Sequence, residues 1–143
     1  MEVELINEVK LGAAKGTPVE EAVGKEYRGE SAEVGLYLAM ARQAYREGYP
    51  EVGEVLTRIA YEEAAHAANF AELAGFISPS TAENIKRMLG GEQAANRGKK
   101  EAATRAKEAG VDPAHDFLDE SSRDEARHAR ALKGLLDRYF PGA

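Results

Sequence analysis

Apolar residues recur along this 143-residue chain three or four positions apart, which is the spacing of a helix face, and not in the alternation of a strand. Val52, Val55, Leu56 and Ile59 are a clear example, because these positions fall on one side of a helix. Gly and Pro interrupt the pattern at only a few points. The pattern predicts an all-α chain with four helices.

The predicted helices span about 17–47, 50–75, 80–109 and 112–139. Two of them begin with a capping box, Thr17-Pro-Val-Glu20 and Ser80-Thr-Ala-Glu83. In this motif the first hydroxyl accepts from the glutamate's backbone amide, and the glutamate side chain accepts from the amide of the first residue. Asp112-Pro113 is predicted to cap the last helix, and glycines mark the ends of the first three. Residues 1–16 form an amphipathic lead-in whose conformation the sequence leaves open.

The sequence repeats itself with a period of 62 residues. Gly29-Glu30 recurs as Gly91-Glu92, Gly48 as Gly110, and Glu63-x-x-His66 as Glu125-x-x-His128. We expect one domain over residues 1–143, built from two helical hairpins at about 17–75 and 79–140. Glu and His three positions apart lie on the same side of a helix, so both can reach one ion. Each hairpin therefore offers a carboxylate together with a carboxylate–imidazole pair.

This is the ligand set of ferritin-like di-iron and di-manganese bundles, in which two helices each give a Glu and two each give Glu-x-x-His. The predicted metal ligands are Glu30, Glu63, His66, Glu92, Glu125 and His128. A single Glu-x-x-His would be weak evidence for a metal site, because exposed Glu and His are common on helices. Two at equivalent positions, in a chain with three histidines, favour a site for two Fe ions, with Mn or Zn as possible occupants.

The same residues resemble the rubrerythrins, and among them the short members of the sulerythrin type that lack a rubredoxin domain. The matching pieces, within about residues 20–135, are Gly29-Glu30-Ser31 with Tyr37, Glu47-Gly-Tyr49, Glu63-x-x-His66, Gly91-Glu92 and Glu125-x-x-His128. The resemblance implies a ferritin-like four-helix bundle whose reduced di-iron site passes two electrons to hydrogen peroxide, yielding water. A rubredoxin-type centre is the usual electron source, and because these residues include no Cys, an external rubredoxin or other reductase is implied.

The chain departs from the family pattern at one position near the site. Typical rubrerythrins carry a second glutamate three residues after the third-helix ligand, where this sequence has Ala95, and a glutamate stands instead at the repeat-equivalent Glu33. In the family that glutamate exchanges with a histidine as the iron changes oxidation state. By the repeat symmetry we hypothesise that Glu33 is a metal ligand that exchanges with His128. The alternative is that Glu33 is a solvated helix residue.

Tyr37 matches a family tyrosine whose hydroxyl supports a ligand carboxylate, and its alternative role is as a core residue. Glu30, Glu33 and Tyr37 are therefore the candidate catalytic residues. His115 lies ten residues before Glu125 and is expected to be exposed and outside the site.

The connection between the second and third helices bears on assembly. In the ferritin-like topology this connection must return roughly 30 Å along the bundle, a distance that follows from the helix lengths at about 1.5 Å per residue. Residues 75–80 reach only about 20 Å when fully extended. We expect a domain-swapped homodimer with two sites, each built from both chains. An unswapped monomer with frayed helix ends is the alternative.

Charge and composition narrow the function further. With 25 acidic and 19 basic residues the chain lacks the electropositive face that nucleic acid requires, and no segment is apolar enough for a membrane span. The amino terminus does not read as a signal peptide, so a cytoplasmic location is expected. The predicted function is a di-iron peroxidase in oxidative stress defence. The alternatives are a ferroxidase or oxygen-scavenging protein, a more distant manganese catalase, and a metal-stabilised structural bundle without turnover.

Overall fold

The computed structural model describes residues 10–142, which form four helices and no strand. The helices are α1 Glu20–Arg46, α2 Pro50–Ala74, α3 Thr81–Glu108 and α4 Asp112–Tyr139. The all-α prediction is confirmed, and the predicted helix boundaries agree to within three residues. None of the described helices is long and apolar enough to cross a membrane.

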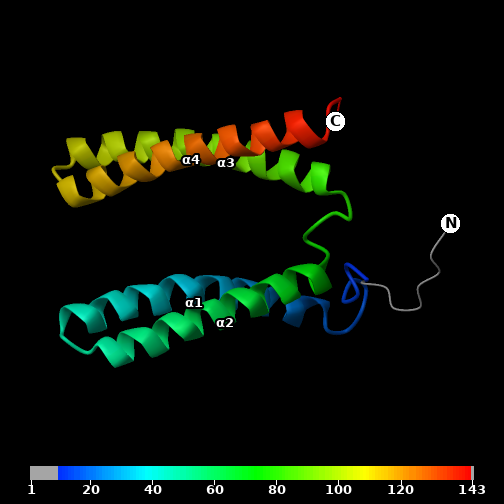
Figure 1. Cartoon of the computed structure of the whole chain (residues 1–143), viewed down its shortest axis with the longest axis horizontal. Helices are drawn as coiled ribbons and strands as arrows, with labels where there is room; N and C mark the ends of the chain where they lie inside the picture. Colours follow the sequence, from blue (N-terminus) through cyan, green and yellow to red (C-terminus); the bar gives the residue numbers. More distant parts are fainter. Residues whose placement is uncertain (1–9, 143) are drawn as a thin grey trace. The chain divides into compact units, whose positions relative to one another are not determined.

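The chain divides after Pro79 into two compact units, and each is a helical hairpin (Figure 1). In the first unit α1 packs along α2, and in the second α3 packs along α4. Each hairpin holds one copy of the 62-residue repeat. The two helices of each repeat copy thus pack against each other, so the candidate ligands of one copy lie in one unit.

The two hairpins turn in the same way. After α1, Gly48 has a φ of 84°, and the Tyr49 amide donates to the Ala44 carbonyl at 2.9 Å. After α3, Gly110 has a φ of 71°, and Val111 donates to Ala106 at 2.9 Å. This is the Schellman ending, whose left-handed residue favours glycine because a Cβ is strained there. The predicted ends of both helices are confirmed.

The predicted capping box at Thr17 is wrong. The helix α1 begins at Glu20, and its N-cap position, Val19, makes no side-chain cap. The Thr17 hydroxyl instead donates to the Ala14 carbonyl at 2.7 Å, and the Glu20 carboxylate accepts from the Gly16 amide at 2.8 Å. The capping side chains are thus used by the turns that precede the helix.

Those turns, in residues 11–19, are held against the end of α2. Gly12 donates to the Glu72 carbonyl at 2.8 Å and Ala14 donates to the Leu73 carbonyl at 3.0 Å. Both carbonyls lie in the last turn of α2, where the helix leaves acceptors free, and that of Glu72 also accepts from the Gly75 amide at 3.0 Å. A small apolar cluster of Ala14, Val23, Phe70 and Ala74 packs beneath them. This tertiary contact explains why the helix starts later than its local sequence predicts.

Ser80 is confirmed as the N-cap of α3, because its hydroxyl accepts from the Glu83 amide at 3.4 Å. The predicted cap of α4 is displaced by one residue. Val111 is the N-cap and makes no side-chain cap, while Asp112 lies in the first turn and pairs with Lys107 at 2.9 Å.

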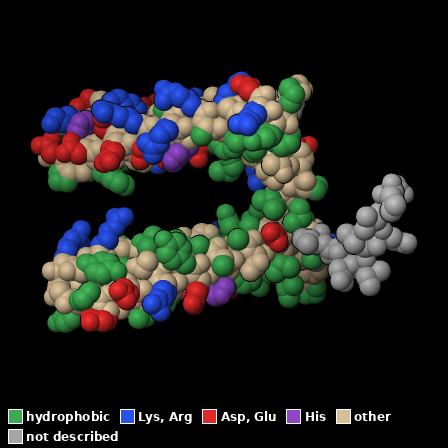
Figure 2. All heavy atoms as spheres, viewed as in Figure 1, with side chains coloured by type: hydrophobic (Ala, Val, Ile, Leu, Met, Phe, Trp, Pro, Cys, Tyr) green, Lys and Arg blue, Asp and Glu red, His purple; other side chains and the backbone are tan. Residues whose placement is uncertain are grey.

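Small side chains fill the contact between the helices of each hairpin. Ala41 in the first hairpin and Ala103 in the second are 2% and 0% exposed, and they are equivalent in the repeat. Large apolar side chains such as Leu36, Tyr61 and Phe117 stay exposed to between 62% and 72%, and Figure 2 shows such side chains on the surface of both hairpins. The partner helix within a hairpin does not cover these residues.

Candidate metal centre

Three candidate ligands of the first repeat copy meet in the first hairpin. Glu30 comes from α1, while Glu63 and His66 come from α2, and one ligand atom of each lies within 4.8 Å of the others. His66 Nδ1 lies 3.0 Å from Glu63 Oε2 and 3.7 Å from Glu30 Oε2. The carboxylates are largely buried and the imidazole is about half exposed. We call these three residues the first triad.

The second hairpin carries the same arrangement in Glu92, Glu125 and His128, which we call the second triad. His128 Nδ1 lies 3.1 Å from Glu125 Oε2 and 3.5 Å from Glu92 Oε2. Here too the carboxylates are the more buried members and the imidazole is about half exposed. All six ligand positions predicted from the repeat therefore fall in two matching triads.

The carboxylates of the first triad are close enough to disturb each other. A hydrogen bond to Glu63 raises the pKa of Glu30, and the same bond lowers the pKa of Glu63. The hydrogen bond from His66 to Glu63 is the main cause that raises the pKa of His66. The triad thus gathers negative charge around a point where a cation would relieve the repulsion.

In the second triad a lysine joins the same pattern. The hydrogen bond between Glu92 and Glu125 raises the pKa of Glu92. The same bond, followed by the hydrogen bond from Lys99, lowers the pKa of Glu125 to about 2. Lys99 was missed by the sequence reasoning. The 62-residue offset could have found it, because that offset places Lys99 at the position of Tyr37.

Glu33 and Tyr37 are not brought into the first triad. Glu33 is exposed, and its charge makes the smallest of the contributions that raise the pKa of Glu30. Tyr37 is half-buried, and with Glu33, Leu36 and Met40 it lines a shallow pocket on α1. The roles predicted for Glu33 as a ligand and Tyr37 as its support stay predictions.

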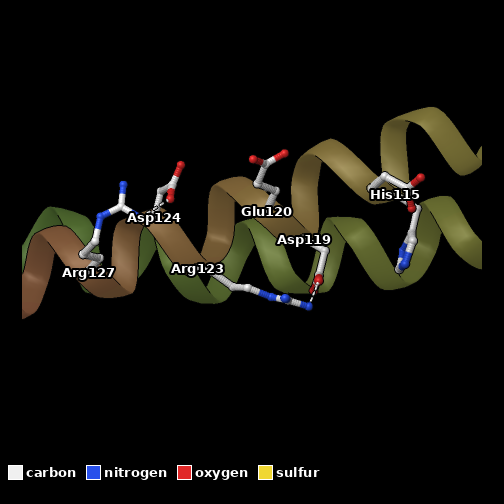
Figure 3. Close-up of a pocket in the computed structure, with 7 residues that line it drawn as sticks. His115, Asp119, Glu120, Arg123, Asp124 and Arg127 are labelled. Carbon is white, nitrogen blue, oxygen red and sulfur yellow. Dashed lines mark hydrogen bonds and ion pairs between the residues drawn. The ribbon is translucent and has the colours of Figure 1, made fainter.

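The third histidine lies apart from the triads, as the sequence predicts, although it is half-buried and not exposed. Its Nδ1 lies 2.9 Å from the Ala103 carbonyl. His115 lines a surface hollow along α4 (Figure 3). In this hollow Arg123 pairs with Asp119, and Arg127 Nη1 lies 2.7 Å from Asp124 Oδ1. Both arginines are thus paired, and the further carboxylates of Asp116 and Glu120 leave the lining of the hollow with a net negative charge.

The donor set of each triad fits a divalent cation. Two carboxylates and an imidazole, with donor atoms within 4.8 Å, can close on one ion without large movement. Oxygen and nitrogen donors of this kind suit iron, manganese or zinc, and the described residues include no thiolate that would favour a softer metal.

Comparison with known proteins identifies the fold and the family. The family model for rubrerythrin matches residues 21–136, which include all six triad residues. An uncharacterised protein of Methanocaldococcus jannaschii is 67% identical over 140 residues, covering 98% of this chain and 99% of its own. Reverse rubrerythrin-1 of Clostridium acetobutylicum is 51% identical over 137 residues, covering 94% of this chain and 76% of its own. The ferritin-like class predicted from the sequence is confirmed, and the chain belongs to the rubrerythrin family.

Proposed function

We propose that this chain is a non-haem di-iron peroxidase that reduces hydrogen peroxide to water. The observation that supports this most strongly is the duplicated triad, in which each hairpin gathers two carboxylates and one imidazole within 4.8 Å. Two matching triads provide the six ligands that a pair of ions needs in ferritin-like proteins. Membership of a family of di-iron proteins agrees with that reading.

When bound and reduced, a pair of irons would supply the two electrons that, with two protons, convert one hydrogen peroxide into two waters. The chain's own residues hold and orient the ions: the first triad through Glu30, Glu63 and His66, and the second through its equivalents. We further propose that Glu33 moves between solvent and the site, and that the Tyr37 hydroxyl supports a ligand carboxylate. Their positions on the same face of α1 as Glu30 support this.

The electrons come from a partner in this proposal. None of the 143 residues is Cys, so these residues provide no ligand for a rubredoxin-type iron. An external rubredoxin or another small reductase would re-reduce the site after each turnover.

We also propose that the working form is a domain-swapped homodimer. The connection from Gly75 to Ser80 spans the same six residues in the structure as in the sequence prediction. It is too short to return along the bundle within one chain, since six extended residues reach about 20 Å. Lengthening it by about ten Gly and Ser residues should convert the dimer into a metal-binding monomer. If the wild type is already a stable metal-loaded monomer by light scattering, the swap is wrong.

The function is tested by anaerobic stopped-flow oxidation of the ferrous-reconstituted protein. Hydrogen peroxide and dioxygen are supplied in separate syringes, and diferric absorption is followed. We expect peroxide to be much the faster oxidant, with one peroxide consumed per pair of irons. The variant His128→Ala, with His115→Ala as its matched control, should lose this reaction while the control retains it.

The other outcomes separate the alternatives. Faster oxidation by dioxygen would favour a ferroxidase or oxygen-scavenging protein with the same ligands. Iron that binds at two per site but is oxidised by neither reagent would favour a structural role. Failure to bind iron, manganese or zinc at all would contradict every metal-dependent function.

A further inference from the structure

A lysine links the two helices of the second hairpin beside the second triad. The Lys99 ammonium, on α3, donates to the Ser121 hydroxyl on α4 at 2.8 Å and also to Glu125 Oε1. The lysine side chain is 34% exposed and the Glu125 side chain 13%, so the contact is only partly open to solvent. A charge pair in such a place is screened less than one on the open surface.

The two oxygens of Glu125 have different partners. Oε1 accepts from Lys99, whereas Oε2 faces the imidazole of His128 at 3.1 Å. The lysine therefore does not displace the triad contact. It balances the charge of the same carboxylate from the opposite side.

The first hairpin has no such cation. The repeat places Tyr37 at the position of Lys99 and Ile59 at the position of Ser121, so neither the ammonium nor its hydroxyl partner exists there. Over residues 10–142, no lysine or arginine forms an ion pair with Glu30 or Glu63. Glu33 adds negative charge to the first triad instead.

We propose that Lys99 makes the two triads unequal by balancing one carboxylate charge of the second triad, so that the first triad binds a divalent cation more tightly. The attraction of a site for a divalent ion depends on the net charge of its ligands. The first triad brings two uncompensated carboxylates. The second brings two carboxylates and a fixed ammonium. This inference rests on the proposed metal site, and it adds an order of loading in which the first triad fills first.

The test measures cobalt binding at the second triad alone. In the full-length chain, Glu63→Ala with His66→Ala removes the first triad, and Co2+ is titrated anaerobically while its visible absorption is followed. Adding Lys99→Met should tighten cobalt binding about tenfold, the order expected when one unit charge near a divalent ion is removed from a partly exposed site. Circular dichroism checks that each variant is folded.

Three further variants separate charge from hydrogen bonding and from general effects. Lys99→Gln removes the charge but keeps a donor, and we expect it to behave as Lys99→Met does. Lys99→Arg keeps the charge and should leave cobalt binding close to that of the background. Lys100→Met is the matched control, because Lys100 pairs with Asp119 at 2.5 Å and not with a triad residue. It should also leave cobalt binding unchanged.

The outcomes against the proposal are distinct. If Lys99→Met leaves cobalt affinity unchanged or weakens it, Lys99 does not balance the charge of the site. If Lys99→Gln behaves as Lys99→Arg does, hydrogen bonding and not charge is the cause, and the proposal is wrong. A wild-type chain that binds no cobalt would overturn the metal site itself, whereas binding that ignores position 99 overturns only the role of Lys99.

Discussion

The two hairpins share a backbone and a triad but differ in the residues that surround the triad. In the second hairpin Lys99 bonds to Ser121 beside the triad, while the repeat-equivalent positions in the first hairpin hold Tyr37 and Ile59. The contact between helices differs in the same sense, since Asn96 in the second hairpin bonds the Ser122 carbonyl at 2.7 Å where the first has Val34. The second hairpin is thus the more polar of two otherwise equivalent units.

This difference shows which features the triad depends on. The i, i+3 spacing and the close contact of two helices over small residues bring the three ligands together in both hairpins. Neither feature requires a polar neighbour. The neighbours are therefore free to differ, and they can set the charge of each triad without moving its ligands.

The largest effect is expected when one imidazole is removed. His66→Ala and His128→Ala should each lower metal affinity by more than about tenfold, because even the groups that merely orient a ligand contribute that much. If the first triad is the stronger, His66→Ala costs more than His128→Ala. Metal content after dialysis, measured by emission spectrometry, checks both, with His115→Ala as the control. Equal losses would show that the triads bind with equal strength.

The next effect concerns the helix contact that both hairpins share. Ala41→Leu and Ala103→Leu each insert a larger side chain where the alanines are 2% and 0% exposed. Each should lower the free energy of unfolding by about 1–3 kcal/mol, because a close-packed contact must open to admit the added methyl groups. Urea unfolding followed by circular dichroism measures both. A hairpin that tolerates its leucine would be packed more loosely than its copy.

Much of this molecule could be predicted from its sequence, for identifiable reasons. The ends of α1 and α3 were predictable because Gly48 and Gly110 mark a local backbone motif. The triads were predictable because each pair, such as Glu63 and His66, is fixed by helix geometry. These features are local in sequence, whereas the third ligand of each triad, such as Glu30, lies on the other helix and was predicted from the repeat.

The rest depends on contacts between residues distant in sequence. The start of α1 was mispredicted because residues 11–19 bond to the end of α2, about sixty positions on. Lys99 was overlooked because its partners Ser121 and Glu125 lie on another helix, and a lone lysine on a charged helix is usually solvated. Such contacts have no signature in local sequence, although comparing the repeat copies position by position would have drawn attention to this one.

A smaller effect is expected from the polar contact in the second hairpin. Asn96→Val gives position 96 the residue that the first hairpin has, and removes the bond to the buried Ser122. It should lower the free energy of unfolding by about 0.5–1.5 kcal/mol, the usual net value of one hydrogen bond. Urea unfolding measures it, with the exposed Gln93→Ala as the control. No loss would mean that the apolar version of the contact is equally stable.

The smallest effect is a pH dependence at a position where only the second hairpin carries an acid. Asp119 accepts hydrogen bonds from Lys100 and Arg123, and these cations hold the pKa of Asp119 below its usual range. The repeat-equivalent residue in the first hairpin is the uncharged Thr57. Because the folded pKa is below the unfolded value, this pair stabilises the hairpin above the unfolded pKa near 3.8, and the contribution is lost as pH falls through the lower folded pKa. Carbon NMR of the Asp119 carboxyl should give a pKa below 3.8, and Lys100→Met should move it upward. A carboxyl that titrates at its ordinary pKa in both proteins would mean that the ion pair does not persist in solution.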